Sequence, residues 1–345
     1  MSSQRTIAGR VAVLTGIVLW MCTGGAAYAQ EVTEFEVPSA RSLLLGIAAG
    51  PDGSLWFTEW SANKIGRITT DGVIKEFKLP GFTCPVDIVA GSDGSLWFTR
   101  GIWSSWQNGS HQSGSMIGRI TTAGVVSEFP IPYSAHGIVA GPDGALWFGE
   151  EGVAKIGRIT TGGVVTQFAT HMDGSVAGIA VGPDGALWFI QFENDKIGRM
   201  TMDGGTSEFK RAGDVRGYGS SVIVSGGDGR LWFDEGAGPA IRQITADGVI
   251  SEFPIPKSKY GARGMALGSD GNIWFTQSQD IDNQIGRITP KGVVTLFDIP
   301  TAGSDTWSIV AGSDGALWFL ERHGNKIGRI TTGRYEGTPA VISRQ

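Results

Sequence analysis

A Leu-Trp-Phe or Ile-Trp-Phe triplet recurs seven times and organises the whole chain. The triplets centre on Trp56, Trp97, Trp147, Trp188, Trp232, Trp274 and Trp318, so successive tryptophans are 41, 50, 41, 44, 42 and 44 residues apart. A period of roughly forty residues, with several short β-type segments per unit, is the signature of a propeller blade. The sequence therefore predicts an all-β, seven-bladed β-propeller with four-stranded blades.

The first complete unit shows how one blade is expected to fold. Its predicted strands, from the inside of the ring outwards, are 46–49, 54–59, 64–69 and 73–78. Asp52-Gly53 supplies turn residues after the inner strand, and an Asp-Gly pair stands at this place in all seven units. We expect these aspartates to form turns rather than calcium sites. Asp71-Gly72 predicts a two-residue hairpin turn before the outer strand, which would place Arg67 opposite Glu76.

The last unit lacks an outer strand of its own. The segment Val32–Pro38 matches Lys75–Pro80, in the outer strand of the first unit, and we expect it to complete blade seven with Glu34 opposite Arg329. This arrangement joins the two ends of the chain and leaves no open seam between blades, which manages the edge problem. The predicted organisation is a signal peptide at 1–29, a propeller at 30–333 and a C-terminal tail at 334–345.

Residues 1–29 have the pattern of a secretory signal peptide. Arg5 and Arg10 precede an apolar run at 11–21, and Ala27-Tyr28-Ala29 fits a cleavage site. The run is too short to span a membrane. We therefore expect a periplasmic or secreted protein that does not span the membrane, with Cys84 as its single remaining cysteine.

The charge balance restricts the class of partner. The formal net charge is −5, and the sequence has no basic run, which argues against nucleic acid. We expect a monomer whose partner is a small-molecule or peptide ligand.

Functional residues of a propeller are expected where the repeat varies around the central channel. The position that begins each inner strand, here called the first ring, carries Leu45, Val86, His136, Ala177, Ser221, Arg263 and Trp307. β-Propensity alone would not select histidine, arginine and tryptophan at one position. Recognition or catalysis is one interpretation, and simple plugging of the channel mouth is the other.

A second ring of polar residues ends the second strand of each blade. It consists of Glu59, Arg100, Glu150, Gln191, Glu235, Gln277 and Glu321. A solvated or cross-paired rim, a metal site and substrate contacts are all compatible with this composition. No His/Asp/Glu cluster with metal-ligand spacing accompanies it.

One loop is longer than its counterparts. The segment Thr99–Met116 of blade two contains Trp103, Trp106 and His111 among Gly and Ser residues. It could fold over the channel mouth as a lid or a grip on an apolar ligand, or it could be a disordered surface loop.

The repeat also resembles a known family. Gly-Pro-Asp-Gly-Ala-Leu-Trp-Phe at 141–148 and Lys-Ile-Gly-Arg-Ile-Thr-Thr at 155–161 resemble the blades of the virginiamycin B lyase (streptogramin lyase) family. The resemblance implies a seven-bladed propeller that linearises cyclic streptogramin B depsipeptides at the ester by elimination. It also implies a histidine base and a magnesium ion. A lactonase-like hydrolase would instead need a carboxylate-ringed metal in the channel, which the first ring lacks.

The family's histidines lie in Pro-His-Gly-Ile starts of late inner strands, and this chain departs from that pattern. Arg263 and Trp307 stand at the late-blade positions, and only Ala135–Ile138 keeps a His-Gly-Ile motif. On this basis His136 is the candidate base. The candidate magnesium ligands are Glu150, Glu235 and Glu321. The candidate ligand contacts are Arg263, Trp307, Trp103, Trp106 and Arg100.

The competing hypothesis is a non-catalytic protein. In it, an extracytoplasmic propeller binds a small molecule, a peptide or an envelope partner through Arg263, Trp307 and the 99–116 loop.

Overall fold

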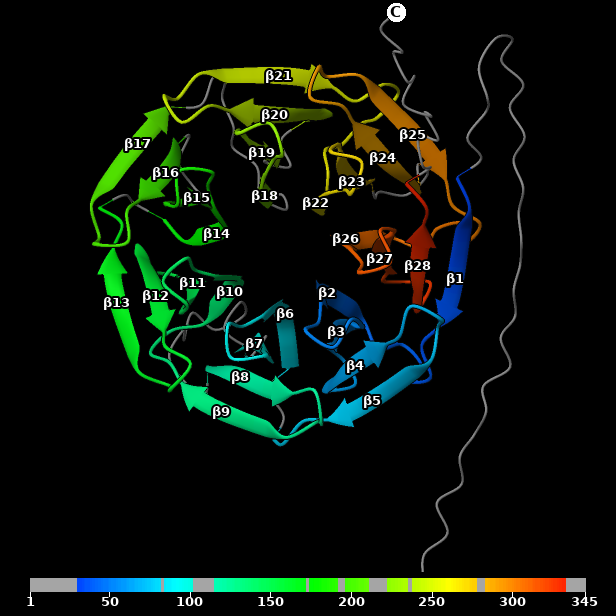
Figure 1. Ribbon diagram of the computed structural model, residues 1–345, viewed down its shortest axis with the longest axis horizontal. Coiled ribbons are helices and arrows are strands. Elements are labelled where there is room, and N and C mark those ends of the chain that lie inside the picture. The colour runs from blue at the N-terminus through cyan, green and yellow to red at the C-terminus, as the bar shows by residue number, and fades with distance from the viewer. Residues whose placement is uncertain are drawn as a thin grey trace, which may run out of the picture.

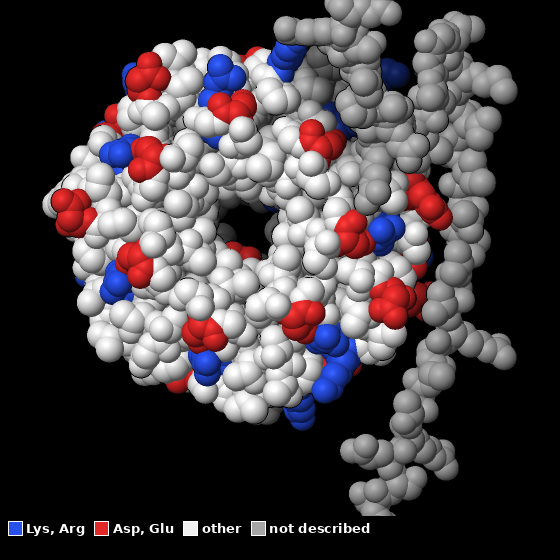
Figure 2. Space-filling model, viewed as in Figure 1, with Lys and Arg blue, Asp and Glu red and all other residues white. Residues whose placement is uncertain are grey.

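The chain forms a closed ring of seven antiparallel sheets. A computed structural model describes residues 30–81, 84–101, 115–171, 174–191, 196–210, 222–234, 238–277 and 283–332. Within these ranges every regular element is a strand, and each of the seven sheets has four strands around a central opening (Figures 1 and 2). The predicted seven-bladed β-propeller is confirmed. No helix in the described ranges is long and apolar enough to cross a membrane.

The strands follow one another outwards in each blade. Blade 1 consists of β2 (Leu44–Ala49), β3 (Leu55–Glu59), β4 (Lys64–Ile68) and β5 (Ile74–Lys78). Blade 2 consists of β6 (Cys84–Ala90), β7 (Ser95–Gly101), β8 (Met116–Thr121) and β9 (Val126–Pro130). Blade 3 consists of β10 (Ala135–Ala140), β11 (Leu146–Glu150), β12 (Lys155–Ile159) and β13 (Val165–Ala169). Blade 4 consists of β14 (Val176–Val181), β15 (Leu187–Gln191), β16 (Lys196–Met200) and β17 (Thr206–Lys210).

The remaining blades follow the same order. Blade 5 consists of β18 (Val222–Ser225), β19 (Leu231–Asp234), β20 (Ala240–Ile244) and β21 (Ile250–Pro254). Blade 6 consists of β22 (Met265–Leu267), β23 (Ile273–Gln277), β24 (Gln284–Ile288) and β25 (Val294–Asp298). Blade 7 combines β26 (Thr306–Ala311), β27 (Leu317–Glu321) and β28 (Lys326–Ile330) with β1 (Val32–Glu36).

The N-terminal strand completes the last blade, as the sequence predicts. β1 pairs antiparallel with β28 from Val32↔Ile330 to Glu36↔Lys326. One detail of the prediction is wrong, because Glu34 lies opposite Gly328 and not Arg329. In Figure 1, β1 lies on the outside of blade 7 and the chain then enters blade 1.

The predicted register of the outer hairpins is wrong by one residue. In blade 1, Arg67 pairs with Lys75, and Glu76 lies opposite Gly66. The amide of Gly72 donates to the carbonyl of Thr69 (2.9 Å), and Gly72 has φ 92°. A turn of this kind has three residues in its loop, the last of them in the left-handed region, instead of two. The extra residue shifts every cross-strand partner.

The corrected register gives the arginines a different partner. Arg67 Nε contacts Asp52 Oδ2 at 2.6 Å, and Asp52 Oδ1 accepts a hydrogen bond from Trp56 Nε1 at 3.0 Å. The same Trp–Asp–Arg arrangement recurs on Asp93, Asp143, Asp184 and Asp314. The first-turn aspartates therefore join the turn to the sheet, and the described residues contain no group of three or more His, Cys, Asp or Glu that could hold a metal.

The Trp-Phe pairs form the core between neighbouring blades. Trp56 is fully buried, stacks on Phe77 of its own blade at 5.4 Å, and packs with Phe98 of blade 2. Phe57 lies so close to Gly66 that a Cβ at that glycine would meet its ring at 2.0 Å. The glycine of each Lys-Ile-Gly-Arg-Ile segment thus makes room for the aromatic ring of the second strand.

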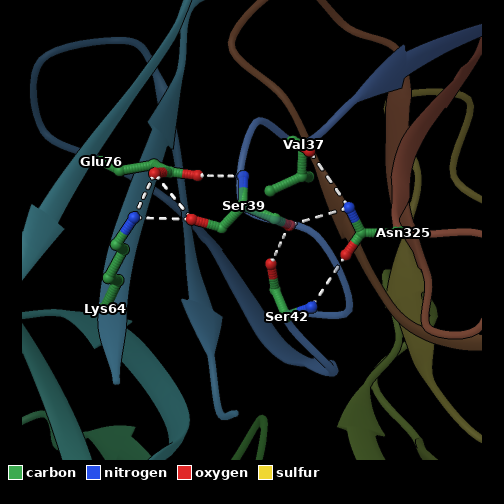
Figure 3. A network of polar contacts seen from close by, with 6 residues as sticks. All are labelled: Val37, Ser39, Ser42, Lys64, Glu76 and Asn325. Atoms are coloured by element: carbon green, nitrogen blue, oxygen red, sulfur yellow. Dashed lines mark hydrogen bonds and ion pairs between the residues drawn. The ribbon is translucent and has the colours of Figure 1, made fainter. Parts of the chain in front are cut away.

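Residues 32–42, here called the closure segment, are held from both sides. Asn325 of blade 7 donates to the carbonyls of Val37 (3.0 Å) and Ser39 (2.9 Å), and its Oδ1 accepts from the amide of Ser42 (2.9 Å). Ser39 in turn donates from its amide to Glu76 of blade 1 at 2.8 Å. Figure 3 shows this network bridging the two blades.

Candidate functional site

The first-ring residues begin the innermost strands, which border the central opening in Figure 1. Leu45, Val86, His136 and Trp307 lie in β2, β6, β10 and β26, and Arg263 lies two residues before β22. All of them are half-buried. These variable positions therefore lie in or just before innermost strands, while Ser221 lies outside the described residues.

Two of the predicted ligand contacts meet at blades 6 and 7. The guanidinium carbons of Arg263 and Arg322 lie 5.1 Å and 4.2 Å from the ring centroid of Trp307. Arg322 also donates through Nε to Oδ2 of Asp305 at 2.5 Å. Cation–π contacts of this kind contribute about 0.5–2 kcal/mol each, depending on desolvation. This group, the Trp307 cluster, holds an aromatic ring and two guanidinium groups in fixed positions.

The charges of the Trp307 cluster are compensated within the fold. Burial lowers the pKa of Arg263, while the nearby carboxylates of Asp305 and Asp234 act in the opposite direction. Asp234 is itself fully buried and accepts a hydrogen bond from the amide of Ala262 at 2.8 Å. The cluster therefore offers N–H donors and a π surface without a large net charge.

A second group forms around His136 in blades 2 and 3. Glu151 Oε2 lies 3.7 Å from His136 Nε2, and the two side chains are 13% and 30% exposed. Asp87 of blade 2 accepts hydrogen bonds from the amides of Ile88 (2.9 Å) and Ile138 (3.1 Å). Burial raises the pKa of Asp87 to about 6, and the charge of His136 acts to lower it. This group, the His136 cluster, combines an imidazole with two carboxyl groups.

Sequence reasoning missed both acidic neighbours of His136 and the arginine on Trp307. Glu151 and Arg322 occupy the same place in their blades, one residue after the end of the second strand. Their amides donate to the carbonyls of Ser134 (2.8 Å) and Asp305 (3.0 Å), which brings each of them beside the first ring. The sequence position that could have revealed Glu151 and Arg322 is the one directly after the second-ring residue of each blade. Asp87 could have been found as the one acidic residue at a position that is often glycine in the repeat.

The second ring is not a solvated rim. Its described members are all buried: Glu59, Arg100, Glu150, Gln191, Gln277 and Glu321. Arg100 pairs with Glu128 and donates through Nη2 to the carbonyl of Pro80 at 2.8 Å, so the structure places it inside the fold and not at the channel mouth. Arg100, Glu150 and Gln191 each have a hydrogen-bond partner among the described residues, whereas the polar side-chain atoms of Glu59, Gln277 and Glu321 are buried without one.

The predicted magnesium ligands do not come together among the described residues. Glu150 accepts both hydrogen bonds of the Gln167 amide nitrogen, at 2.8 Å and 2.6 Å, and Glu321 lies in a different blade beside Glu34 and Lys326. A hard divalent cation needs six or more oxygen ligands, several of them from the protein or from water. These two glutamates do not supply such a set. Glu235, Trp103, Trp106 and His111 lie outside the described residues.

Comparison with known proteins agrees with the geometry of the ring. The profile of the virginiamycin B lyase family matches residues 23–135 and 103–338. A solved streptogramin B lyase has a TM-score of 0.77 and 33% identity, over 88% of this chain and 97% of that chain. The virginiamycin B lyase of Staphylococcus aureus has a TM-score of 0.76 and 31% identity, over 88% and 99%.

Two further proteins of the same name are similar to this chain. A catalytically inactive form of the Staphylococcus aureus enzyme, with one histidine replaced by alanine, has been solved with quinupristin. The virginiamycin B lyase of Bordetella parapertussis is 48% identical over 50 residues, which span 14% of this chain and only 17% of that protein. The profile match covers most of the chain and the structural match most of both proteins. The chain therefore belongs to the virginiamycin B lyase family.

Proposed function

We propose that this chain is a carbon–oxygen lyase that opens a cyclic depsipeptide ester, with His136 as the general base. One observation carries the proposal: His136 is half-buried at the start of β10 and has the carboxyl groups of Glu151 and Asp87 beside it. A base in such a reaction must be reachable by the substrate and must be stabilised once it has taken a proton. The His136 cluster meets both requirements.

The chemistry asked of this cluster is a proton transfer coupled to bond cleavage. His136 would remove the proton from the carbon α to a carbonyl. The electrons of that C–H bond form a C=C bond, the C–O bond at the neighbouring carbon breaks, and the ester leaves as a carboxylate. Glu151 and Asp87 would favour the imidazolium that forms. Asp87 is fixed by the two backbone amides that donate to it, so it also positions the start of β10.

The direct test is incubation of residues 30–345 with a streptogramin B, with and without magnesium. Elimination within a ring yields a linear product of unchanged mass, whereas hydrolysis adds the mass of one water molecule. We expect ring opening without mass change, and a decrease of roughly 10²–10⁴-fold in His136→Ala. His171→Asn is the matched control, because His171 is exposed and belongs to neither cluster. Absence of turnover, or full turnover in His136→Ala, would remove the proposal.

A second candidate function is ligand binding without catalysis. It is favoured by the Trp307 cluster, which occupies late-blade positions where the family resemblance implies histidines. Equilibrium binding of quinupristin, followed by tryptophan fluorescence, distinguishes the two. Binding that is lost in Trp307→Ala, unchanged in His136→Ala and never followed by ring opening supports recognition alone.

Export is part of either proposal. The pattern of residues 1–29 supports a cleavable signal peptide, and N-terminal sequencing of the protein from a periplasmic extract is expected to begin at Gln30. A mature protein that retains Met1 in the cytoplasm would contradict this.

A further inference from the structure

Three described blades balance the charges at the buried end of the second strand. Blade 2 places Arg100 against Glu128, and blade 4 places Lys196 against Glu208, while its second strand ends in the neutral Gln191. Blade 3 has one carboxylate, Glu150, and one lysine, Lys155, joined by Gln167. In each case one cation faces one carboxylate.

Blades 7 and 1 carry one carboxyl group too many. In blade 7, Lys326 Nζ pairs with Glu34 at 2.8 Å, and Glu321 is a second, fully buried acid. In blade 1, Lys64 Nζ pairs with Glu76 at 2.5 Å, and Glu59 is again fully buried.

The extra carboxyl groups also receive no hydrogen bond from a donor. Among the described residues no donor hydrogen bonds to either side-chain oxygen of Glu59 or Glu321, and each carboxyl group lies within hydrogen-bonding reach of a second one, Glu76 for Glu59 and Glu34 for Glu321. The neighbouring hydroxyls point elsewhere, because Ser42 donates to the carbonyl of Ser39 and Ser304 donates to Asn283 Oδ1. Burying an unpaired ionised carboxylate is costly, so such a group takes up a proton instead.

Both carboxyl groups adjoin the contacts that hold the closure segment. Glu34, the neighbour of Glu321, lies in β1, and it also accepts hydrogen bonds from the amide (2.9 Å) and hydroxyl (2.6 Å) of Thr301. Glu76, the neighbour of Glu59, receives the amide (2.8 Å) and hydroxyl (2.9 Å) of Ser39 (Figure 3). The charged groups that face Glu321 are Glu34 and Lys326, and those that face Glu59 are Glu76 and Lys64.

We propose that Glu59 and Glu321 form a proton-dependent latch on ring closure. While both are protonated, blades 1 and 7 each hold a single Lys–Glu pair and the closure segment stays in place. When they ionise, each lysine faces two carboxylates, and repulsion acts on Glu34 in β1 and on Glu76, which holds Ser39. Raising the pH therefore loosens residues 32–42.

The direction of the pKa shifts agrees with this geometry. Burial, with a contribution from Glu76, raises the pKa of Glu59 from 4.5 to about 7. Burial, with a contribution from Glu34, raises that of Glu321 to about 8. A raised carboxyl pKa means that the folded state binds more protons than the unfolded state above pH 4.5. The stabilisation is complete below that pH and is lost as the pH rises to about 7 and 8.

The test compares the wild type with Glu59→Gln, Glu321→Gln and the double variant between pH 5.5 and 8.5. Hydrogen exchange of residues 32–42 is measured relative to β13 of the same molecule, which removes the intrinsic effect of pH. We expect the relative exchange of the wild type to rise by up to about tenfold per pH unit for each carboxyl, and that of the double variant to stay level.

A variant that gains the same pH dependence in another blade provides the matched control. Gln191→Glu gives blade 4 the composition of blades 1 and 7, and we expect a new pH dependence in β17 alone. The infrared difference spectrum of wild type minus double variant at pH 6 is expected to show a protonated carboxylic acid band, because the subtraction removes the contribution of Asp87. The proposal fails if wild type and double variant show the same pH dependence, or if that band is absent from the difference spectrum.

Discussion

At the scale of single residues, the scaffold depends on one aspartate per blade more than on its arginine–glutamate pairs. Asp143 accepts hydrogen bonds from Trp147 Nε1 (3.0 Å), the amide of Ala145 (3.2 Å) and Arg158 Nε (2.7 Å). It therefore ties a buried tryptophan, a turn and the third strand together. A buried donor that loses its acceptor costs about 1–3 kcal/mol.

We expect Asp143→Ala to lower the free energy of unfolding by about 1–3 kcal/mol, because it leaves Trp147 Nε1 without its acceptor. Asp143→Asn keeps an oxygen for Trp147 and should lose less. Urea unfolding measures both. Asp71→Ala is the control, because Asp71 lies exposed in an outer turn and should change the value by about 0.5 kcal/mol or less. Equal losses in Asp143→Ala and Asp71→Ala would contradict the role assigned to Asp143.

At the scale of strands, the sequence predicts the arrangement well and its register poorly. The Trp-Phe triplets and the Glu-Phe motif of β1 are local patterns, so the number of blades and the closing strand follow from them. A two-residue and a three-residue outer turn differ by only one loop residue, and that residue shifts the cross-strand partner of Arg67 from Glu76 to Lys75. Contacts between blades cannot be predicted from a local pattern, which is why Asp87 of blade 2 was missed beside His136 of blade 3.

The same limit applies to the second ring. Glutamates usually mark a surface, so the burial of Glu59 and Glu321 runs against expectation from composition. The burial of Glu59 and Glu321 is explained only by the packing of β1, the third strands and the neighbouring blade around them.

Deleting residues 30–38 tests the closing strand. The deletion removes the five-residue pairing of β1 with β28 and the stacking of Phe35 on Trp318 at 5.5 Å. It also leaves β28 as an open edge, so we expect a lower melting temperature and increased aggregation. The sequence-matched control is deletion of residues 334–345, which should cost far less. A synthetic peptide of residues 30–42 should restore stability to the first deletion by adding the strand in trans. Equal melting temperatures for the two truncations would contradict the prediction.

At the scale of the whole molecule, two sets of acidic groups limit stability from opposite sides. Burial alone would raise the pKa of the Trp–Asp–Arg aspartates, but hydrogen bonds from tryptophan and arginine outweigh it and lower the pKa. A lowered pKa stabilises the fold above 3.8 and loses that effect as the pH falls. Glu59 and Glu321 act in the reverse direction.

We therefore expect the ring to be most stable at about pH 4, between the ordinary pKa of aspartate (3.8) and that of glutamate (4.5), with losses on both sides. The midpoint of urea unfolding, followed from pH 2.5 to pH 9, gives the profile. Glu59→Gln with Glu321→Gln should flatten only the alkaline side, and Asp143→Asn should reduce only the acid side. A maximum above pH 8 in the wild type would be incompatible with this assignment.

The partnership of β1 with β28 has a consequence for the order of events during synthesis. β1 leaves the ribosome before any blade exists, yet its hydrogen-bonding partner is the last strand of the described chain. Six sheets can assemble from neighbours in the sequence while the seventh waits for nearly the full length of polypeptide. The slowest step in maturation should thus be the meeting of the earliest-made and latest-made strands, since pairings between distant segments form slowly.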